Sequence, residues 1–301
     1  MSDKTDQRLR LSLARLEVFV ATARAGSTRA AAGRVARSQS AASASLAELE
    51  AAFGVPLFDR VGRRLVLNEH GRALLPRAVQ LLDDAAEVEA VFDATRPAPS
   101  LRLAASFTVG EYLLPALIAS WRSAHPLQAV RLDIGNTSDV ASALLAFDAD
   151  VGFVEGAVDN PLLRVRRWRS DELVIVAAPG HPLALGRATL RQLAEAPWVL
   201  RERGSGTREA SDRWLSARVA PMRVAFELGS SEAIKRIVRA GLGLGCLSRL
   251  AVADELAEGS LVEIKTVLPR AARALSLVVH RERRLGPSAQ AFVDWCQQAA
   301  G

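Results

Sequence analysis

Residues 15–71 of the chain read RLEVFVATARAGSTRAAAGRVARSQSAASASLAELEAAFGVPLFDRVGRRLVLNEHG. Apolar side chains recur at helical spacing at the start of this stretch and predict a first helix with one buried face. Gly26-Ser27 ends that helix and supplies the cap of a second helix over residues 28–35. Ser38 caps a third helix that runs to about Phe53, and only a tight turn fits between the second and third helices.

The residues that follow predict a β-hairpin, or wing. Two apolar segments, Val55–Phe58 and Leu65–Leu67, flank an arginine-rich tip at residues 60–64. Helix, helix, turn, helix and hairpin together are typical of a winged helix-turn-helix, and we assign this all-α winged unit to residues 13–68. Small side chains should let its second and third helices cross closely, namely Ala31, Ala32, Ala41, Ala42 and Ala44.

A helix-turn-helix presents the first residues of its third helix to base edges in the DNA major groove. Four polar residues occupy these positions, and glutamine bonds adenine through two hydrogen bonds; they are Ser38, Gln39, Ser40 and Ser43. Arginines nearby should contact phosphates, namely Arg29, Arg34 and Arg37. Arg63 and Arg64 at the hairpin tip suit a narrow minor groove. Periodicity alone fits a small helical bundle with solvated arginines equally well.

A long amphipathic helix is predicted over residues 69–95, with Asn68 as its cap. Its apolar residues follow the heptad spacing that lets two helices wrap around each other, at Leu74, Ala78, Leu81, Ala85, Val88 and Phe92. A helix of this length would extend about 40 Å and could hold two DNA-reading heads apart. Alternatively, this helix packs on its own domain instead of pairing with the helix of a second chain. Prolines at 97 and 99 should end the helix in a hinge over residues 96–100.

Composition and charge limit the possible classes of protein. The 301 residues include 50% hydrophobic and 24% charged residues and carry a net charge of +6, which fits about two folded domains. Residues 1–77 hold thirteen basic and seven acidic side chains, whereas residues 78–95 hold only acidic ones. We expect a cytoplasmic protein, because no apolar run reaches membrane-spanning length and the two cysteines need no disulfide.

From Leu101 to the end of the chain, strands and helices alternate, which predicts an α/β domain with largely parallel sheets. The expected strands are Leu101–Ala105, Val130–Ile134, Val151–Val154, Leu173–Ala178, Val224–Leu228 and Leu275–Val279. The expected helices are Glu111–Ser123, Val140–Phe147, Thr207–Ala217, Glu232–Ala240 and Pro287–Gln298.

Four strand-to-helix junctions in this domain are rich in small polar residues. Helix N-termini present free N–H groups that hold anions, so four junctions converging on one cleft would make a small-anion site. Each junction alone fits an ordinary helix cap. The candidate ligand-binding residues are Ser106, Phe107, Thr108, Asn136, Thr137, Arg203, Gly204, Ser205, Gly206, Thr207, Ser230 and Ser231.

Signatures of catalysis are weak throughout the sequence. The glycine-rich run at residues 241–245 follows a helix rather than a strand, unlike a nucleotide-binding loop. Ser205 lacks the spacing of a hydrolase nucleophile. The four histidines are isolated, without metal-ligand spacing. We therefore expect no enzyme, no metal and no cofactor, only a small anionic effector molecule.

The chain resembles the LysR-type transcriptional regulators over nearly its whole length. In the head the resemblance rests on Gly26-Ser27, Ala31-Ala32, Ser38-Gln39, Leu49-Glu50, Gly54-Val55, Leu57-Phe58, Arg60 and Asn68–Gly71. In the second domain it rests on runs at 110–115, 135–137, 152–156, 201–209 and 227–235, and it adds Glu155 to the effector-binding residues. Ser40 and Ala44 depart from the usual proline and arginine, and both departures are similar to the YeiE-like, sulfite-responsive subgroup.

The resemblance implies a two-lobed, periplasmic-binding-protein-like effector domain over residues 101–301. Lobe 1 would span about 101–168 and 274–301, lobe 2 about 172–270, with chain crossings near 168–172 and 270–274. It also implies a homodimer or homotetramer on an interrupted palindromic operator in double-stranded DNA, with RNA polymerase as a further partner and a sulfur oxyanion, sulfite first, as effector. The alternative is an anion-binding solute module with a non-specific basic head.

Overall fold

The computed structural model describes residues 11–92, 98–216, 218–219 and 221–298, which divide into two compact units. The first unit comprises the described residues up to Pro99 with the short segments 146–148 and 282–286, and the second comprises the rest. Within the described ranges, no helix combines the length and apolar character needed to cross a membrane.

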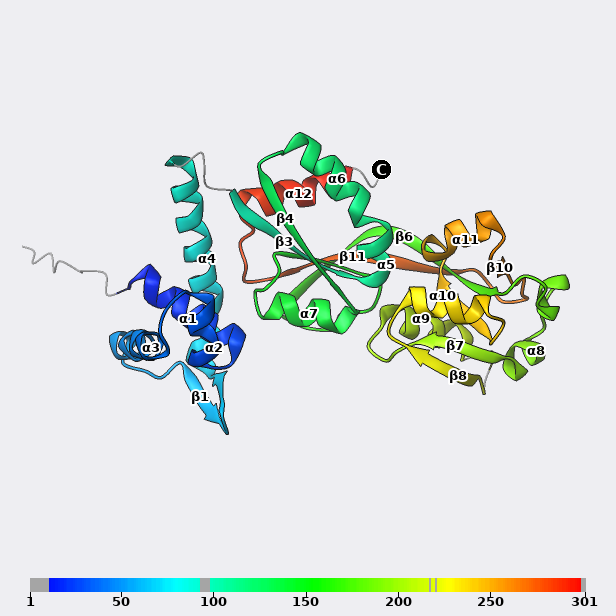
Figure 1. Cartoon of the computed structure of the whole chain (residues 1–301), viewed down its shortest axis with the longest axis horizontal. Coiled ribbons are helices and arrows are strands. Elements are labelled where there is room, and N and C mark those ends of the chain that lie inside the picture. Colours follow the sequence, from blue (N-terminus) through cyan, green and yellow to red (C-terminus); the bar gives the residue numbers. More distant parts are fainter. Residues whose placement is uncertain (1–10, 93–97, 217, 220, 299–301) are drawn as a thin grey trace, which may run out of the picture. The chain divides into compact units, whose positions relative to one another are not determined.

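The first unit contains the predicted head. Its elements are α1 (Leu13–Ala25), α2 (Thr28–Arg34), α3 (Gln39–Phe53), β1 (Phe58–Val61) and β2 (Arg64–Leu67) (Figure 1). The Ser27 and Ser38 hydroxyls cap α2 and α3 by accepting from the backbone N–H groups of Ala30 and Ala41, as predicted. Gly54 ends α3 with a left-handed φ of 72°.

Two expectations about the head need correction. The first strand of the hairpin lies further along the chain than predicted, at Phe58–Val61, whereas the second, Arg64–Leu67, lies where it was expected. Gly62 and Arg63 form the turn. Gly62 has a φ of 62°, which permits this tight reversal. Ala44 is exposed and so does not space the helices, whereas Ala31, Ala32 and Ala42 are buried in the head core.

Helix α4 (Glu69–Phe92) follows the hairpin, and the Asn68 carboxamide caps it by accepting from the Gly71 N–H at 2.9 Å. The predicted heptad positions differ in burial along it. Ala78 is 1% exposed within the head core, whereas Leu81 and Val88 are 42% and 61% exposed. The Phe92 side chain and residues 93–97 lie outside the described residues. Residues 98–100, the end of the expected hinge, belong instead to a strand.

Lobe 1 of the second unit has three strands, β3 (Ala98–Ser106), β4 (Gln128–Gly135) and β5 (Val151–Val154), of which β3 and β5 are parallel. Its helices are α5 (Phe107–Tyr112), α6 (Leu114–Ala124), α7 (Thr137–Leu145) and α12 (Pro287–Gln298). The single helix expected over 111–123 is two helices, broken at Leu113. Pro115 explains the break, because it has no N–H to donate to the Glu111 carbonyl.

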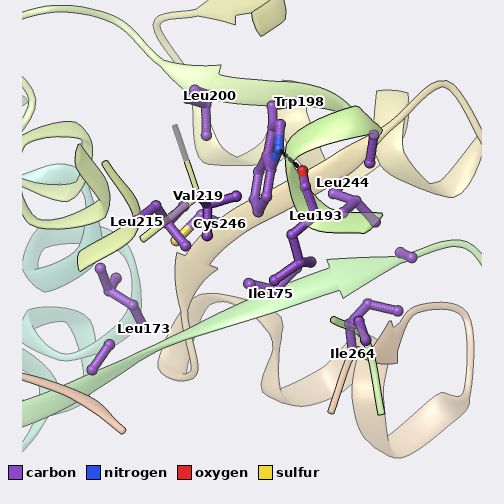
Figure 2. Close-up of a cluster of buried hydrophobic side chains, with 14 of the residues drawn as sticks. Leu173, Ile175, Leu193, Trp198, Leu200, Leu215, Val219, Leu244, Cys246 and Ile264 are labelled. Atoms are coloured by element: carbon purple, nitrogen blue, oxygen red, sulfur yellow. Dashed lines mark hydrogen bonds between the residues drawn. The ribbon is translucent and has the colours of Figure 1, made fainter. Parts of the chain in front are cut away.

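Lobe 2 contains strands β7 (Pro197–Arg201), β8 (Arg223–Leu228), β9 (Leu244–Ser248) and β10 (Val262–Glu263). Its helices are α8 (Leu190–Glu195), α9 (Gly206–Leu215), α10 (Ser231–Arg239) and α11 (Ala253–Glu258), with 3-10 turns at Pro182–Leu185 and Leu250–Val252. Trp198 lies at the centre of its core, and its indole N–H donates to the Leu193 carbonyl at 2.8 Å (Figure 2). Burying each large side chain of this core contributes about 1.5–3 kcal/mol.

Two long strands, β6 (Leu163–Ala177) and β11 (Ala271–His280), run through both lobes (Figure 1). They pair antiparallel with each other, β11 pairs with β5 of lobe 1, and β6 pairs with β9 of lobe 2. The expected largely parallel sheet is therefore wrong: the described sheet is mixed, because both crossing strands run antiparallel to their neighbours. The proposed crossing points lie on the paired stretches of β6 and β11.

Candidate functional site

The head has a hollow of about 560 Å³ between α3 and the hairpin. Polar and basic side chains line it from both sides, among them Arg29, Gln39, Ser43, Arg60, Arg63 and Arg64. The third helix and the wing therefore present their polar side chains to one concave surface. Arg60, which the predicted set of contacts did not include, reaches this hollow from β1.

The side chains predicted to contact DNA differ in whether they already form hydrogen bonds within the head. Ser38 caps α3, and its hydroxyl lies 3.0 Å from that of Ser40. The Ser43 hydroxyl donates to Thr28 at 3.2 Å. Gln39 is exposed, and its side chain has no hydrogen bond to the described residues. Arg34 and Arg37 are also exposed but do not line the hollow.

In the second unit, residues from both lobes converge on the buried carboxyl of Glu155. The Ser106 and Thr108 hydroxyls, where β3 meets α5, donate to it. Thr207, in the first turn of α9 on the other lobe, donates to the Glu155 Oε1 atom at 3.4 Å. One carboxyl thus binds hydroxyls from both sides of the cleft.

Arg273 is the cation at the floor of this cleft. Its Nη atoms donate to Thr207 at 2.9 Å and to Thr108 at 3.2 Å, while its Nε pairs with Asp171 at 2.7 Å. Sequence reasoning missed Arg273. The signal available was one charged residue within Ala271–Leu275, a run of otherwise apolar residues in a strand.

The predicted junctions Asn136-Thr137 and Gly204–Gly206 meet across the cleft. A Cβ atom built on Gly206 would lie 2.4 Å from the Gly156 nitrogen and 2.8 Å from the Thr137 hydroxyl, so only glycine fits. The Thr137 hydroxyl oxygen is buried and has no hydrogen-bond partner among the residues that the structure describes. A buried polar atom without a partner is uncommon in folded proteins and indicates a place where a ligand or water binds.

Of the two arginines at the start of the third junction, Arg201 reaches the cleft and the predicted Arg203 does not. Arg201 is 1% exposed, stacks over the Phe107 ring at 4.6 Å and donates to the Ser231 hydroxyl at 3.3 Å. Arg203 is exposed and has no contact with these residues among those described. The end of the strand explains the difference, because Arg201 is the last residue of β7 whereas Arg203 lies in the turn that follows.

The remaining predicted residues occupy the edges of the same cleft. Ser205 and Ser230 cap α9 and α10 and so place two helix N-termini there. The Asn136 carboxamide caps α7 by accepting from the Asp139 N–H. A Cβ on Gly204 would lie 3.2 Å from the Ser138 hydroxyl of the facing lobe, which confirms that these loops are adjacent.

Burial and two nearby arginines act in opposite directions on the Glu155 carboxyl. Burial raises the pKa of the Glu155 carboxyl above its ordinary value, and the nearby guanidinium groups of Arg273 and Arg201 partly oppose that change. The cleft combines two buried guanidinium groups, Arg201 paired with Glu202 at 2.8 Å and Arg273 paired with Asp171 at 2.7 Å, with hydroxyl donors and two helix N-termini. The hydroxyl groups and helix N-termini are donors suited to a small oxyanion.

Comparison with known proteins gives the family. Residues 13–72 match the bacterial regulatory helix-turn-helix proteins of the lysR family, and residues 94–301 match the LysR substrate binding domain. The chain belongs to the LysR family. It is 48% identical to the transcriptional regulator YeiE of Escherichia coli K12, over 97% of this chain and 99% of that protein.

Solved structures of other LysR-type proteins share the fold. A full-length OxyR variant from Pseudomonas aeruginosa matches with a TM-score of 0.73 at 20% identity, covering 96% of each chain. The regulatory domain of Synechocystis CcmR, solved with 2-PG, matches with a TM-score of 0.62 at 27% identity, covering 67% of this chain and 97% of that one. The matched families and relatives are transcription regulators and not enzymes. This LysR-type protein is therefore a DNA-binding regulator that carries an effector-binding domain.

Proposed function

We propose that this LysR-type regulator senses a small inorganic oxyanion, with sulfite as the first candidate, in the cleft between its lobes. The observation that carries the proposal is the buried Thr137 hydroxyl without a partner, set between two glycine backbones. Arg201, Arg273 and the N-termini of α9 and α10 supply the positive potential that an anion needs. Similarity to the sulfite-responsive subgroup supports sulfite in particular.

On the DNA side, we propose that Gln39 contacts bases and that the arginines around the hollow contact phosphates. Ser43 lines the same hollow as Gln39. Other candidate contacts are exposed near the start of α3, namely Ser38, Ser40, Arg34 and Arg37. A homodimer or homotetramer would place several heads on an interrupted palindrome, because each head reads one half-site. Specific binding should survive competitor DNA, which a merely basic head would not achieve.

Thermal unfolding across a panel of anions tests the effector proposal. A ligand that binds only the folded protein raises its unfolding temperature by mass action. We expect a saturable rise with sulfite and a smaller or no rise with sulfate, thiosulfate or simple carboxylates. A rise with a carboxylate alone would replace the sulfur oxyanion, and no rise with any member would contradict the anion cleft.

The variant Ser106→Ala tests the cleft directly. It removes the hydroxyl that donates to Glu155 and should weaken sulfite binding in calorimetry while leaving DNA affinity without ligand unchanged. The exposed Ser123→Ala on α6, outside the cleft, is the matched control. Unchanged sulfite affinity in Ser106→Ala would count against the proposed site.

A further inference from the structure

A second hollow, of about 660 Å³, adjoins the cleft but has different walls. It includes Glu155, Gly156 and Arg273, whereas Ser106, Thr137 and Arg201 do not line it. The exposed Ala272 and Ala274 of β11 also line it. Because alternate side chains of a strand point to opposite faces, these alanines lie on the face of β11 opposite the Arg273 guanidinium. The hollow therefore extends to the face of β11 opposite the Arg273 guanidinium, and we call it the rear groove.

The walls of this rear groove are apolar and fixed in place. Trp214 of α9 lines it, packs against the lobe 2 core and donates its indole N–H to the Pro269 carbonyl at 2.9 Å. Leu173, part of the same core (Figure 2), and the half-exposed Val165 line it from β6. Alanines on β11 and α9 leave the space between these walls open.

The rim of the rear groove is basic. Arg213 has only a 4.0 Å contact with Glu209, and Arg218 has no side-chain partner among the described residues. Arg270 pairs with Glu172 at 2.8 Å and remains 85% exposed. Among the described residues that line the groove, the acidic one is Glu155, whose carboxyl is engaged by Ser106, Thr108 and Thr207.

We propose that the rear groove binds an organic anion with an apolar or aromatic body and at least one acidic group. The apolar walls would bury the body of such a molecule, and Arg213 and Arg218 would hold its acidic group. A small hydrated oxyanion gains nothing from these walls, so this ligand class differs from that of the cleft. The volume is typical of sites that hold small organic molecules.

Calorimetric titration of the full-length protein tests the proposal with three probes: 4-phenylbutyrate, naphthalene-1-sulfonate and octanoate. We expect saturable binding of at least one acid at one site per chain. The matching alcohol, in which a hydroxyl replaces the acidic group, should bind about tenfold more weakly or less. Absence of saturable binding by all three acids, or equal affinity of acid and alcohol, would overturn the proposal.

Variants locate the site. Ala274→Trp fills the groove from an exposed position, and Arg218→Ala removes the arginine that has no partner among the described residues, so each should weaken acid binding about fivefold or more. Arg191→Ala, whose side chain is 88% exposed on α8 outside the groove, should bind as the unmodified protein does. Ser106→Ala should also bind the acid normally, which separates this site from the cleft. Unchanged affinity in both Ala274→Trp and Arg218→Ala would refute the assignment.

Discussion

At the scale of single residues, Gln39 is the side chain on which base preference should depend. It is exposed at the start of α3 and has no internal hydrogen bond among the described residues, so its carboxamide is available to a base. We predict that Gln39→Ala loses about 1–3 kcal/mol of discrimination between a preferred duplex and one with a substituted adenine. Fluorescence anisotropy with both duplexes measures the difference.

Arg63→Ala is the matched comparison for Gln39→Ala. Arg63 lies in the hairpin turn, where a phosphate or minor-groove contact is expected. Its loss should weaken binding to both duplexes alike and reduce the salt dependence of the affinity by about one unit of slope. Discrimination that survives in Gln39→Ala would remove Gln39 from base readout.

The buried carboxyl of Glu155 should make stability depend on pH. Because burial raises the pKa of Glu155 in the folded state, the unfolded chain binds fewer protons at this group over the intervening pH range. The contribution of Glu155 to the free energy of unfolding is complete at pH values below the ordinary pKa of glutamate. It is lost as the pH rises through the raised pKa of Glu155 in the folded state. Glu155→Gln should remove this part of the pH dependence, as urea unfolding at a series of pH values would measure. Parallel curves of unfolding free energy against pH for the unmodified protein and Glu155→Gln would contradict this prediction.

At the scale of elements, α4 should contribute to self-association. Its first half packs on the head, while Leu81 and Val88 remain exposed along the predicted seam. We predict that the double variant Leu81→Glu, Val88→Glu raises the dissociation constant of the oligomer by about tenfold or more in sedimentation equilibrium. Leu185→Glu, at a position 88% exposed on lobe 2, is the control. An unchanged mass distribution would exclude α4 from the interface.

Local signals explain which elements were predictable from sequence. Helix α3 begins after its N-cap Ser38 and ends at its C-cap Gly54, and α4 begins after its N-cap Asn68. The first strand of the hairpin was placed too early because apolar content marks Val55–Phe58, whereas pairing extends up to the turn at Gly62. Strand direction was also missed, since β6 and β11 pair across about a hundred residues of chain.

The candidate site was predictable only in part for a similar reason. Glycine, serine and threonine at strand-to-helix junctions identified the loops that meet in the cleft. Arg273 was missed, and Arg203 was chosen over its neighbour Arg201, because the direction of a strand side chain depends on the register of the whole sheet. Arg203, two residues beyond Arg201, illustrates how a short displacement past the strand end exposes a side chain.

At the scale of the whole molecule, closure of the two lobes should couple effector binding to the affinity of the protein for DNA. Contacts between lobes already exist where Gly156 meets Gly206 and where the Tyr112 hydroxyl donates to Glu232 at 2.5 Å. A ligand can shift the arrangement only by its difference in affinity for the two states. Gly206→Ala should hold the lobes apart, because its Cβ would meet the Gly156 backbone. Gly229→Ala, with no atom within 4 Å, is the matched control.

The most direct test measures operator affinity and bending with and without saturating sulfite, on a duplex selected from random sequence. We predict that sulfite changes operator affinity or bending for the unmodified protein and for Gly229→Ala, and changes neither for Gly206→Ala. Identical complexes in all three proteins despite saturable sulfite binding, or a normal response in Gly206→Ala, would contradict the account.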